Sequence, residues 1–499
     1  MNRRLLFTIA NVVFCVVTAI ATVLRPEAGV HPLYVVMLFA LCSGPILKSE
    51  QPNDRYALLV VFFATYFVMF GITDFSHIVL GNSQLTNLVD GSGNEPLSKP
   101  ELVILVGGAL LLFGYLVTCR PSDVAKDSPK DWPEKTLVIA GCLLWTVCTW
   151  LVWDLRVHFI VDTTVENIAR GYASLGSVRT IVYTLATYLQ PLGIVILAYA
   201  QCRYHRRYLL PLIAMAIAAE MVLGFVSDIK GQVVVGLVLI AITKLLVDGS
   251  IPKTRLLMIL FAATLIFPIL QANRLLHMQG IVNNARAAAD ITTIFKRAFS
   301  VSKEAFSSAE RPDTFFERLS LKSSVNMIVT HAGTDVPYQD GYTLQPIVTS
   351  FIPRIIWPTK PAIETGRLVN RAFNVTESND IYISPSYLGE LYWNFGWLGV
   401  LLGMSLMGAI LGYVGARCDP SRSTTLTRIL VLLATCKLLI LGFEGTIAAQ
   451  YSQWLRTLVA IGISHVLLSR NRAVIRQGDA QSEPVPPEIL TAHFDNLMP

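Results

Sequence analysis

Long apolar runs separated by short polar segments repeat along most of the chain. Most of these runs reach the roughly 20 residues that an α-helix needs to cross the hydrocarbon core of a bilayer. The pattern predicts an all-α polytopic membrane protein with about twelve transmembrane helices. The expected spans are residues 5–24, 32–47, 56–80, 101–119, 136–155, 180–200, 207–226, 231–247, 255–271, 387–415, 425–446 and 453–469.

Lys and Arg are distributed unevenly between the two sets of connections that join these spans. With the N-terminus inside the cell, the cytoplasmic segments carry nineteen of them and the short outer loops carry seven. Cytoplasmic loops of membrane proteins are enriched in Lys and Arg, so this bias predicts that both termini face the cytoplasm. No small-residue cleavage site follows the first apolar run, and we therefore expect a retained helix and not a signal peptide.

The predicted topology divides the chain into four parts: transmembrane helices 1–9 in 1-271, a large periplasmic loop in 272-385, transmembrane helices 10–12 in 386-470, and a disordered cytoplasmic tail in 471-499. A long loop in an otherwise compact protein is usually functional. Within it, residues 283–309 and 312–332 have the apolar spacing of surface helices. A basic segment stiffened by prolines follows them.

Composition supports the membrane assignment and excludes several kinds of function. Of the 499 residues, 53% are hydrophobic and 15% are charged, whereas soluble domains carry about a quarter charged residues. The net charge of +6 comes largely from short loops, so it does not indicate nucleic-acid binding. The eight cysteines have no C-x-x-C spacing, and we expect neither a disulfide framework nor a metal site. No nucleotide-binding loop or hydrolase motif occurs, so we expect no cofactor and neither an ATP-driven pump nor a serine hydrolase.

The strongest candidate for chemistry is the segment 351–374. Prolines at 353, 358 and 361 predict a stiff, non-helical stretch between them. Trp357 lies in this stretch, and four cations fall within the segment: Arg354, Lys360, Arg367 and Arg371. Arg presents a planar fork of donors to phosphate oxygens and Lys adds a point charge, so the segment suits a phosphate-bearing lipid. A periplasmic loop whose cations reach lipid headgroups is the ordinary alternative.

Further cations lie at the predicted outer ends of helices: Arg156, Arg170, Lys230, Arg274 and Arg318. Each is a candidate phosphate ligand and several also have a simpler interpretation. Arg274 would anchor its helix at the interface, Lys230 would pair with the neighbouring Asp228, and Arg318 would lie on a solvated helix face.

Two residues near the basic segment are candidate bases. Glu390 lies near the top of the tenth predicted helix, where a carboxylate would act on a hydroxyl or pair with an arginine. His331 lies in the large loop and would act as a base or be a bystander. A third charged residue, Lys437, falls in mid-span, where charges normally face a cavity or a partner; Glu444 and Glu220 are its candidate partners.

The pattern 352-IPRxxWPxKP-361, then Gly366, then 388-LGExxxNFGxxG-399 running into a helix, resembles the Wzy-type oligosaccharide repeat-unit polymerases. The predicted topology, with both ends inside and large third and fifth outer loops, is similar to that family. The family's O-antigen members are described with an Arg-x10-Gly pattern in both large loops. Here the step from Arg354 to Gly366 is one residue longer, and the third loop, 156–179, lacks that spacing.

The resemblance implies a GT-C-like enzyme of the bacterial inner membrane that transfers glycans on the periplasmic side. Its donor would be a growing glycan on undecaprenyl diphosphate, and its acceptor a lipid-linked repeat unit whose hydroxyl attacks the anomeric carbon. We assign catalytic roles to Arg354, Lys360, Glu390, Arg318 and His331. We assign diphosphate or glycan binding to Arg274, Lys230, Arg156, Arg170, Arg367 and Trp357. Fixed cations would stabilise the charge that develops on the leaving diphosphate.

Membrane lipids are expected partners, and the resemblance suggests a chain-length regulator and a flippase as others. Three alternatives stay open at the level of sequence. An O-antigen ligase would use the same chemistry with a histidine in its large loop. A transporter or flippase for the same lipid-linked sugar would show paired charges along a central path and broken helices. A scaffold of an export complex has no positive feature in the sequence.

Overall fold

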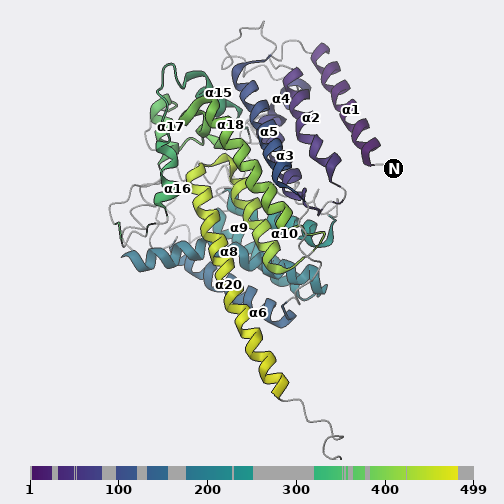
Figure 1. The fold of residues 1–499 in the computed structure, drawn as a ribbon, viewed down its shortest axis with the longest axis vertical. Helices are drawn as coiled ribbons and strands as arrows, with labels where there is room; N and C mark the ends of the chain where they lie inside the picture. Colours follow the sequence, from purple (N-terminus) through teal and green to yellow (C-terminus); the bar gives the residue numbers. More distant parts are fainter. Residues whose placement is uncertain are drawn as a thin grey trace, which may run out of the picture.

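The computed structural model describes residues 3–24, 32–49, 51, 53–80, 97–120, 132–155, 176–226, 230–250, 320–350, 352, 356–357, 364–376, 382–422 and 424–481. Within these residues the regular elements are all helices, and an isolated bridge between Ala332 and Val336 closes a turn. Figure 1 shows them as one bundle. The elements are α1 (Arg3–Leu24), α2 (Pro32–Lys48), α3 (Ala57–Phe70), α4 (Ile72–Leu80), α5 (Lys99–Thr118), α6 (Glu134–Asp154), α8 (Gly176–Tyr204), α9 (Leu209–Val226), α10 (Lys230–Asp248), α15 (Lys322–His331), η4 (Tyr342–Leu344), α16 (Pro346–Thr349), α17 (Thr365–Phe373), α18 (Ser386–Arg417), α19 (Leu426–Thr435), η5 (Cys436–Ile440), η6 (Leu441–Glu444) and α20 (Ile447–Gln481).

Each predicted span that falls within the described residues coincides with a helix or with two or three consecutive helical segments. The span predicted at 255–271 lies outside the described residues. Among the described helices, five are long and apolar enough to cross a membrane, or six if α3 and α4 together count as one span. The chain is therefore a multi-pass membrane protein whose described regular elements are all helices, and the number twelve stays a prediction.

The predicted span 56–80 is broken into α3 and α4, which meet at an angle of 51°. Gly71 stands at the break, where an added Cβ would lie 2.7 Å from the Phe67 ring. The break releases backbone carbonyls from the helical ladder, and these need other donors. The hydroxyl of Tyr34 on α2 donates to Phe70 O at 2.9 Å.

Among the described helices, α5 and α18 share the most extensive packing interface. A Cβ added to Gly114 of α5 would lie 2.0 Å from Ser405 O, and one added to Gly408 of α18 would lie 2.0 Å from Leu111 O. Small residues let helix backbones approach closely in a membrane, where apolar burial alone does not hold helices together. These glycines fix α18 against α5 and so fix the elements at its ends.

The remaining helices pack around this pair as two further groups. In one, α6 packs along α8, which is followed by α9 and α10. In the other, α19 continues through the π turn η5 and the 3-10 turn η6 and packs against α20. In Figure 1, α20 continues beyond the other helices, so helix extends to Gln481 within the segment predicted as tail.

The connections predicted to face the cytoplasm gather at one end of the bundle. Hydrogen bonds from side chains to backbone carbonyls join them, among them Tyr115 to Arg55, Asn53 to Leu246, Tyr199 to Thr424, and Tyr204 to Trp132. The opposite end, at which α5, α18 and α20 begin, is covered by α15, α17 and the described residues between them. We call it the capped end.

Of the two surface helices predicted in the large loop, the first, 283–309, lies outside the described residues. The second, 312–332, is described only from residue 320 onward, where α15 forms. The basic segment 353–361 is described only at residues 356 and 357.

Candidate active site

Asn394 holds the loop 339–343 onto the outer part of α18 at the capped end. Its Oδ1 accepts a hydrogen bond from the Gly341 N–H (3.0 Å), and its Nδ2 donates to Thr343 Oγ1 (2.7 Å). The side chain of Asn394 is fully buried, so these bonds are protected from water. The loop therefore has a single defined place on α18.

A kink in α18 makes this attachment possible. Phe395 and Gly396 depart from helical geometry, and Gly396 has φ 58, in the left-handed region that glycine tolerates best. The kink frees the Trp393 carbonyl, which accepts a hydrogen bond from the Gln339 N–H at 3.0 Å. The loop thus completes the hydrogen bonding of a broken helix.

Glu390 lies one turn before Asn394 and is fully buried. Its Oε2 accepts a hydrogen bond of 2.7 Å from the backbone N–H of Ile447, the first residue of α20. A carboxylate at a helix N-terminus satisfies a free donor and interacts favourably with the helix dipole. The Thr343 hydroxyl also interacts with the Glu390 carboxyl, whose Oε1 makes no hydrogen bond of standard geometry among the described residues.

This arrangement bears on the two roles expected for Glu390. Its described partners are a backbone N–H and a hydroxyl, and not an arginine. The carboxyl has no exposed surface. A group that takes a proton from a substrate must come within hydrogen-bond reach of it, so in this arrangement Glu390 joins α18, α20 and the loop.

Helix α17 carries Arg367 and Arg371, the two cations of segment 351–374 that the structure describes. Arg367 is mostly buried, and its Nη1 lies 3.9 Å from Glu364 Oε1. Glu364 also pairs with Arg371 at 3.3 Å. One carboxylate, that of Glu364, thus faces two guanidinium groups on the same short helix.

Gly366 is the glycine of the family pattern, and the structure explains why a side chain does not fit there. An added Cβ would lie 2.3 Å from the ring of Tyr382. The Gly366 carbonyl accepts a hydrogen bond from the Ile383 N–H at 3.1 Å. These contacts join α17 to the chain that leads into α18.

His331 lies at the end of α15 and is exposed. Its Nδ1 is 2.8 Å from Asp335 Oδ2, with 47% and 73% of the two side chains exposed. A carboxylate on one imidazole nitrogen orients the ring and leaves the other nitrogen free for chemistry. The pair is therefore the accessible acid–base group among the residues that the sequence singled out and the structure describes.

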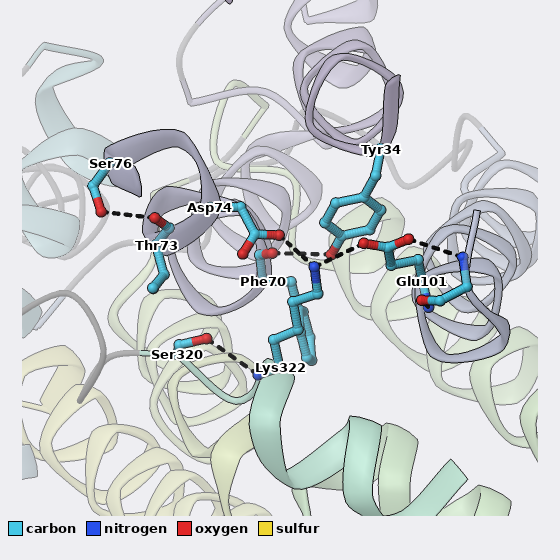
Figure 2. A network of polar contacts seen from close by, with 9 residues as sticks. Tyr34, Phe70, Thr73, Asp74, Ser76, Glu101, Ser320 and Lys322 are labelled. Atoms are coloured by element: carbon cyan, nitrogen blue, oxygen red, sulfur yellow. Dashed lines mark hydrogen bonds and ion pairs between the residues drawn. The ribbon is translucent and has the colours of Figure 1, made fainter. Parts of the chain in front are cut away.

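A second polar cluster lies where α15 meets the membrane helices (Figure 2). Lys322 Nζ is 2.5 Å from Asp74 Oδ2 of α4 and 2.9 Å from Glu101 Oε1 of α5. It also lies 4.4 Å from the centroid of the Tyr34 ring. Burial lowers the pKa of Lys322, but the charges of Asp74 and Glu101 outweigh it and raise that pKa above 10.5. The ammonium group therefore lies between carboxylates of two separate membrane helices.

Lys437, the cation predicted in mid-span, lies in the π turn η5. It lines a cavity of about 20 Å³ together with residues of α8, α10 and α20, about the space that one water molecule occupies. Glu220 on α9 is the carboxylate whose charge acts on it, as the sequence allowed. Glu444 belongs to the next turn, η6.

The site residues predicted from the sequence divide into three groups according to where the structure places them or whether it describes them. Glu390, His331 and Arg367 are brought to the capped end. Trp357 is half-buried, and Lys230 begins α10, where only its backbone is described. The rest lie outside the described residues: Arg354, Lys360, Arg318, Arg274, Arg156 and Arg170.

Sequence reasoning missed the polar residues that hold the capped end together. Asn394 lies inside the motif that carries the resemblance, yet was not singled out. Asp74 and Glu101 are acidic residues in or at the edge of apolar runs, which is a signal of a buried partner. Their partner, Lys322, is 248 residues from Asp74, and no local pattern shows that pairing.

Within the described residues, no three His, Cys, Asp or Glu side chains gather in a way that could hold a metal ion. A family model described as O-antigen polysaccharide polymerase Wzy matches residues 5–442, which include the described elements from α2 to η5 and all but the first two residues of α1. Neither a curated protein nor a solved structure matches the chain.

Proposed function

The chain belongs to the Wzy family of O-antigen polysaccharide polymerases, and from this premise we propose that it joins undecaprenyl-diphosphate-linked repeat units on the periplasmic side of the inner membrane. The capped end would be the periplasmic end and would hold the reaction. Family members polymerise O-antigen repeat units, which is glycosyl transfer. The donor, the side of the membrane and the roles of individual residues are the proposal.

The observation that carries the proposal is the attachment of the basic segment to the capped end on both sides. Before it, the Ser350 carbonyl accepts a hydrogen bond from Arg456 of α20. After it, the Gly366 carbonyl of α17 accepts a hydrogen bond from the N–H of Ile383, which lies three residues before α18 begins. Arg354 and Lys360 lie between these two fixed points in the chain. We infer that their side chains bind the lipid diphosphate, because Arg and Lys form charge-assisted hydrogen bonds to phosphate oxygens.

In the proposed reaction, the acceptor hydroxyl gives its proton to His331, which Asp335 orients. The acceptor oxygen forms a bond to the anomeric carbon of the donor, and the bond from that carbon to the diphosphate oxygen breaks. Undecaprenyl diphosphate leaves with the electron pair. Fixed cations in a water-poor site stabilise this developing charge more than they would in bulk water.

Arg354 and Lys360 would be the principal diphosphate ligands in this reaction, with Arg367 beside them. Glu390 and Asn394 would act through position, because both are fully buried. The remaining predicted residues belong to the same proposal as contacts to the lipid or glycan: Arg318, Arg274, Lys230, Arg156, Arg170 and Trp357.

A flippase would also have broken helices, and this chain has them at α3/α4 and at α19. At each of these breaks, a backbone carbonyl accepts a hydrogen bond from another part of the protein. Met69 O accepts from the Leu321 N–H at 2.9 Å, and Leu438 O accepts from the Tyr387 hydroxyl at 3.0 Å. Broken helices of transporters instead direct free backbone groups at cargo. This difference favours the polymerase.

The test uses a strain that lacks the gene, complemented with wild type, Arg354→Ala or Lys360→Ala, at matched protein levels. Arg422→Ala is the matched control, since Arg422 lies at the opposite end of α18 and pairs with Asp419. Surface glycan is resolved by size, and the lipid-linked pool is extracted. We expect single repeat units and no long chains in the deletion and in both loop variants, and long chains with the control.

Other distributions of surface glycan and lipid-linked intermediates would support a different function. Long chains that accumulate on undecaprenyl diphosphate would indicate a ligase, and repeat units trapped on the cytoplasmic face would indicate a flippase. Unchanged long chains in the deletion strain would reject all three functions. Long chains with both loop variants would reject their assignment as diphosphate ligands.

A further inference from the structure

Lys322 lies at the capped end, yet the proposed reaction does not use it. It is the first residue of α15, and its side chain is only 20% exposed. Figure 2 shows the ammonium group between Asp74 and Glu101, with the Tyr34 ring beside it. The carboxylates come from α4 and α5 and the ring from α2, so one lysine joins the large loop to three membrane helices.

The break between α3 and α4 receives the chain that leads into α15. Leu321, the residue before Lys322, donates its backbone N–H to Met69 O at 2.9 Å, in the last turn of α3 before the break. Asp74, which binds Lys322, lies in the first turn of α4 just beyond it. Phe70 O, between them, is bonded by the Tyr34 hydroxyl. The backbone of Leu321 and the side chain of Lys322 therefore both attach at the break between α3 and α4.

The charges of the cluster favour the attached state. Asp74 and Glu101 bring two negative charges, and their side chains are only 10% and 4% exposed. Glu101 is also held by the capping box with Ser98, so it cannot turn away to water without losing that cap. Without the lysine, two carboxylates would face each other in a largely buried place, which is unfavourable for both.

The position of α15 sets the positions of the proposed reacting groups. Its apolar face packs on α18, where the side chain of Ile328 comes within 3.0 Å of the place that a Cβ on Gly389 would take. Its last residue is His331. The chain then reaches Gln339 and Gly341, which bond to Trp393 and Asn394. The lysine is thus the fixed start of a segment that carries the base and the loop.

We propose that Lys322 is a positioning residue for the transfer reaction, which docks the large loop onto the broken helix α3/α4 by pairing with Asp74 and Glu101. It touches no substrate. Its loss leaves every proposed ligand and base in the chain but frees the segment that presents them. This inference rests on the proposed polymerase function.

The experiment uses full-length protein in lipid nanodiscs and lipid-linked repeat units extracted from the deletion strain. Initial rates are measured against repeat-unit concentration for wild type, Lys322→Met and Lys322→Arg. They are also measured for Lys322→Asp, for Asp74→Lys and for the exchange variant that combines these two substitutions. Lys244→Met is the matched control, because Lys244 pairs with Asp248 at the other end of the bundle. Thermal melting in detergent and protein recovery are recorded for each variant.

We expect Lys322→Met to lower kcat at least tenfold with a much smaller change in KM, and Lys322→Arg to stay within threefold of wild type. The exchange variant should have a kcat at least fivefold higher than that of either single substitution, because it restores opposite charges across the same contact. A lysine that bound the diphosphate directly could not be moved to position 74, so an exchange variant as inactive as its singles, though folded, overturns the proposal.

Other outcomes are equally decisive. A folded Lys322→Met protein with wild-type kcat overturns the positioning role. If that variant is not recovered, the exchange and arginine variants still decide the result, since both keep a charge pair. An inactive wild-type protein counts against the proposed function and not against the docking contact, which the recovery and melting of the exchange variant then test by themselves.

Discussion

The backbone N–H of Ile447 donates a hydrogen bond of 2.7 Å to Glu390 Oε2. This contact joins the first residue of α20 to the outer part of α18, 57 residues earlier in the chain. The carboxyl is fully buried, so it holds the two helices in register at the end where the basic segment is attached. We therefore propose that Glu390 acts by holding the two helices in place.

Replacing Glu390 tests that interpretation. Glu390→Gln keeps an oxygen that can accept from Ile447, so we expect a folded protein whose transfer rate stays within about tenfold of wild type. Glu390→Ala leaves the N–H unpaired and should lower the free energy of unfolding by about 1–3 kcal/mol. Melting in detergent and initial rates measure the two effects. A folded Glu390→Gln protein with a hundredfold loss of rate would show that the carboxylate takes part in the chemistry.

Asn394 forms hydrogen bonds to the loop 339–343 through both its amide oxygen and its amide nitrogen. Asn394→Ala leaves the Gly341 N–H without its acceptor, and we expect a loss of about 1–3 kcal/mol in stability together with a lower transfer rate. Thr343→Val removes one bond of the same network and should cost less. Melting and rates are compared for the two variants. If Asn394→Ala matched wild type in both measurements, the loop would not depend on this side chain.

Gly366 and Tyr382 make a direct packing contact that a double-mutant cycle can measure. Gly366→Ala forces a methyl group against the ring and should cost about 1–3 kcal/mol. Tyr382 is 43% exposed, so Tyr382→Ala alone should cost little. In the Tyr382→Ala background the alanine at 366 finds space, and we expect a coupling of about 0.5–3 kcal/mol between the two changes. Additive costs would mean that the glycine serves a different purpose.

The orientation of the bundle can be measured with single cysteines in a background free of the eight native ones. Thr334 is exposed at the capped end, and Ser421 is exposed at the opposite end. The Lys and Arg bias predicts that the capped end lies outside, so we expect a membrane-impermeant maleimide to label Thr334→Cys in intact spheroplasts. Ser421→Cys should react only after permeabilisation. The reverse pattern would invert the topology.

The long helices were predictable from sequence because they are apolar runs, and such runs have few alternatives in a membrane. The breaks were not. Residues 56–80 form one continuous apolar run, and the bend at Gly71 depends on Leu321, more than 200 residues later, which bonds the released carbonyl of Met69. The kink at Gly396 likewise depends on Gln339 and Asn394.

The candidate site was predictable to the same extent. Arg367 and His331 stand out as charged or titratable groups near a motif, and the structure brings them to one end. Lys322 gave no local signal, because its importance comes from Asp74 and Glu101 on helices far away in the chain. Glu390 was visible as an acid, but its burial against α20 follows from packing that the sequence does not display.

His331 provides the most direct test of the proposed chemistry, because it is exposed and its loss should not disturb the fold. An exposed ion pair such as His331 with Asp335 contributes about 0–1 kcal/mol to stability. Removal of a general base typically costs about 10²–10⁴-fold in rate. We therefore expect His331→Gln to melt like wild type and to lose at least a hundredfold in kcat, and Asp335→Asn to lose less in the same direction, since it only orients the ring.

The matched control for this prediction is His465→Gln. His465 is also an exposed histidine on a helix and also has one described partner, the Thr427 hydroxyl at 2.9 Å, but it lies on α20 away from the capped end. It should retain wild-type kcat. Equal losses in the two variants would point to a general effect of losing a histidine, and a fully active His331→Gln protein would exclude His331 as the base. In that second case a buried group would have to become accessible during turnover, and Glu390→Gln would then be the variant that loses activity.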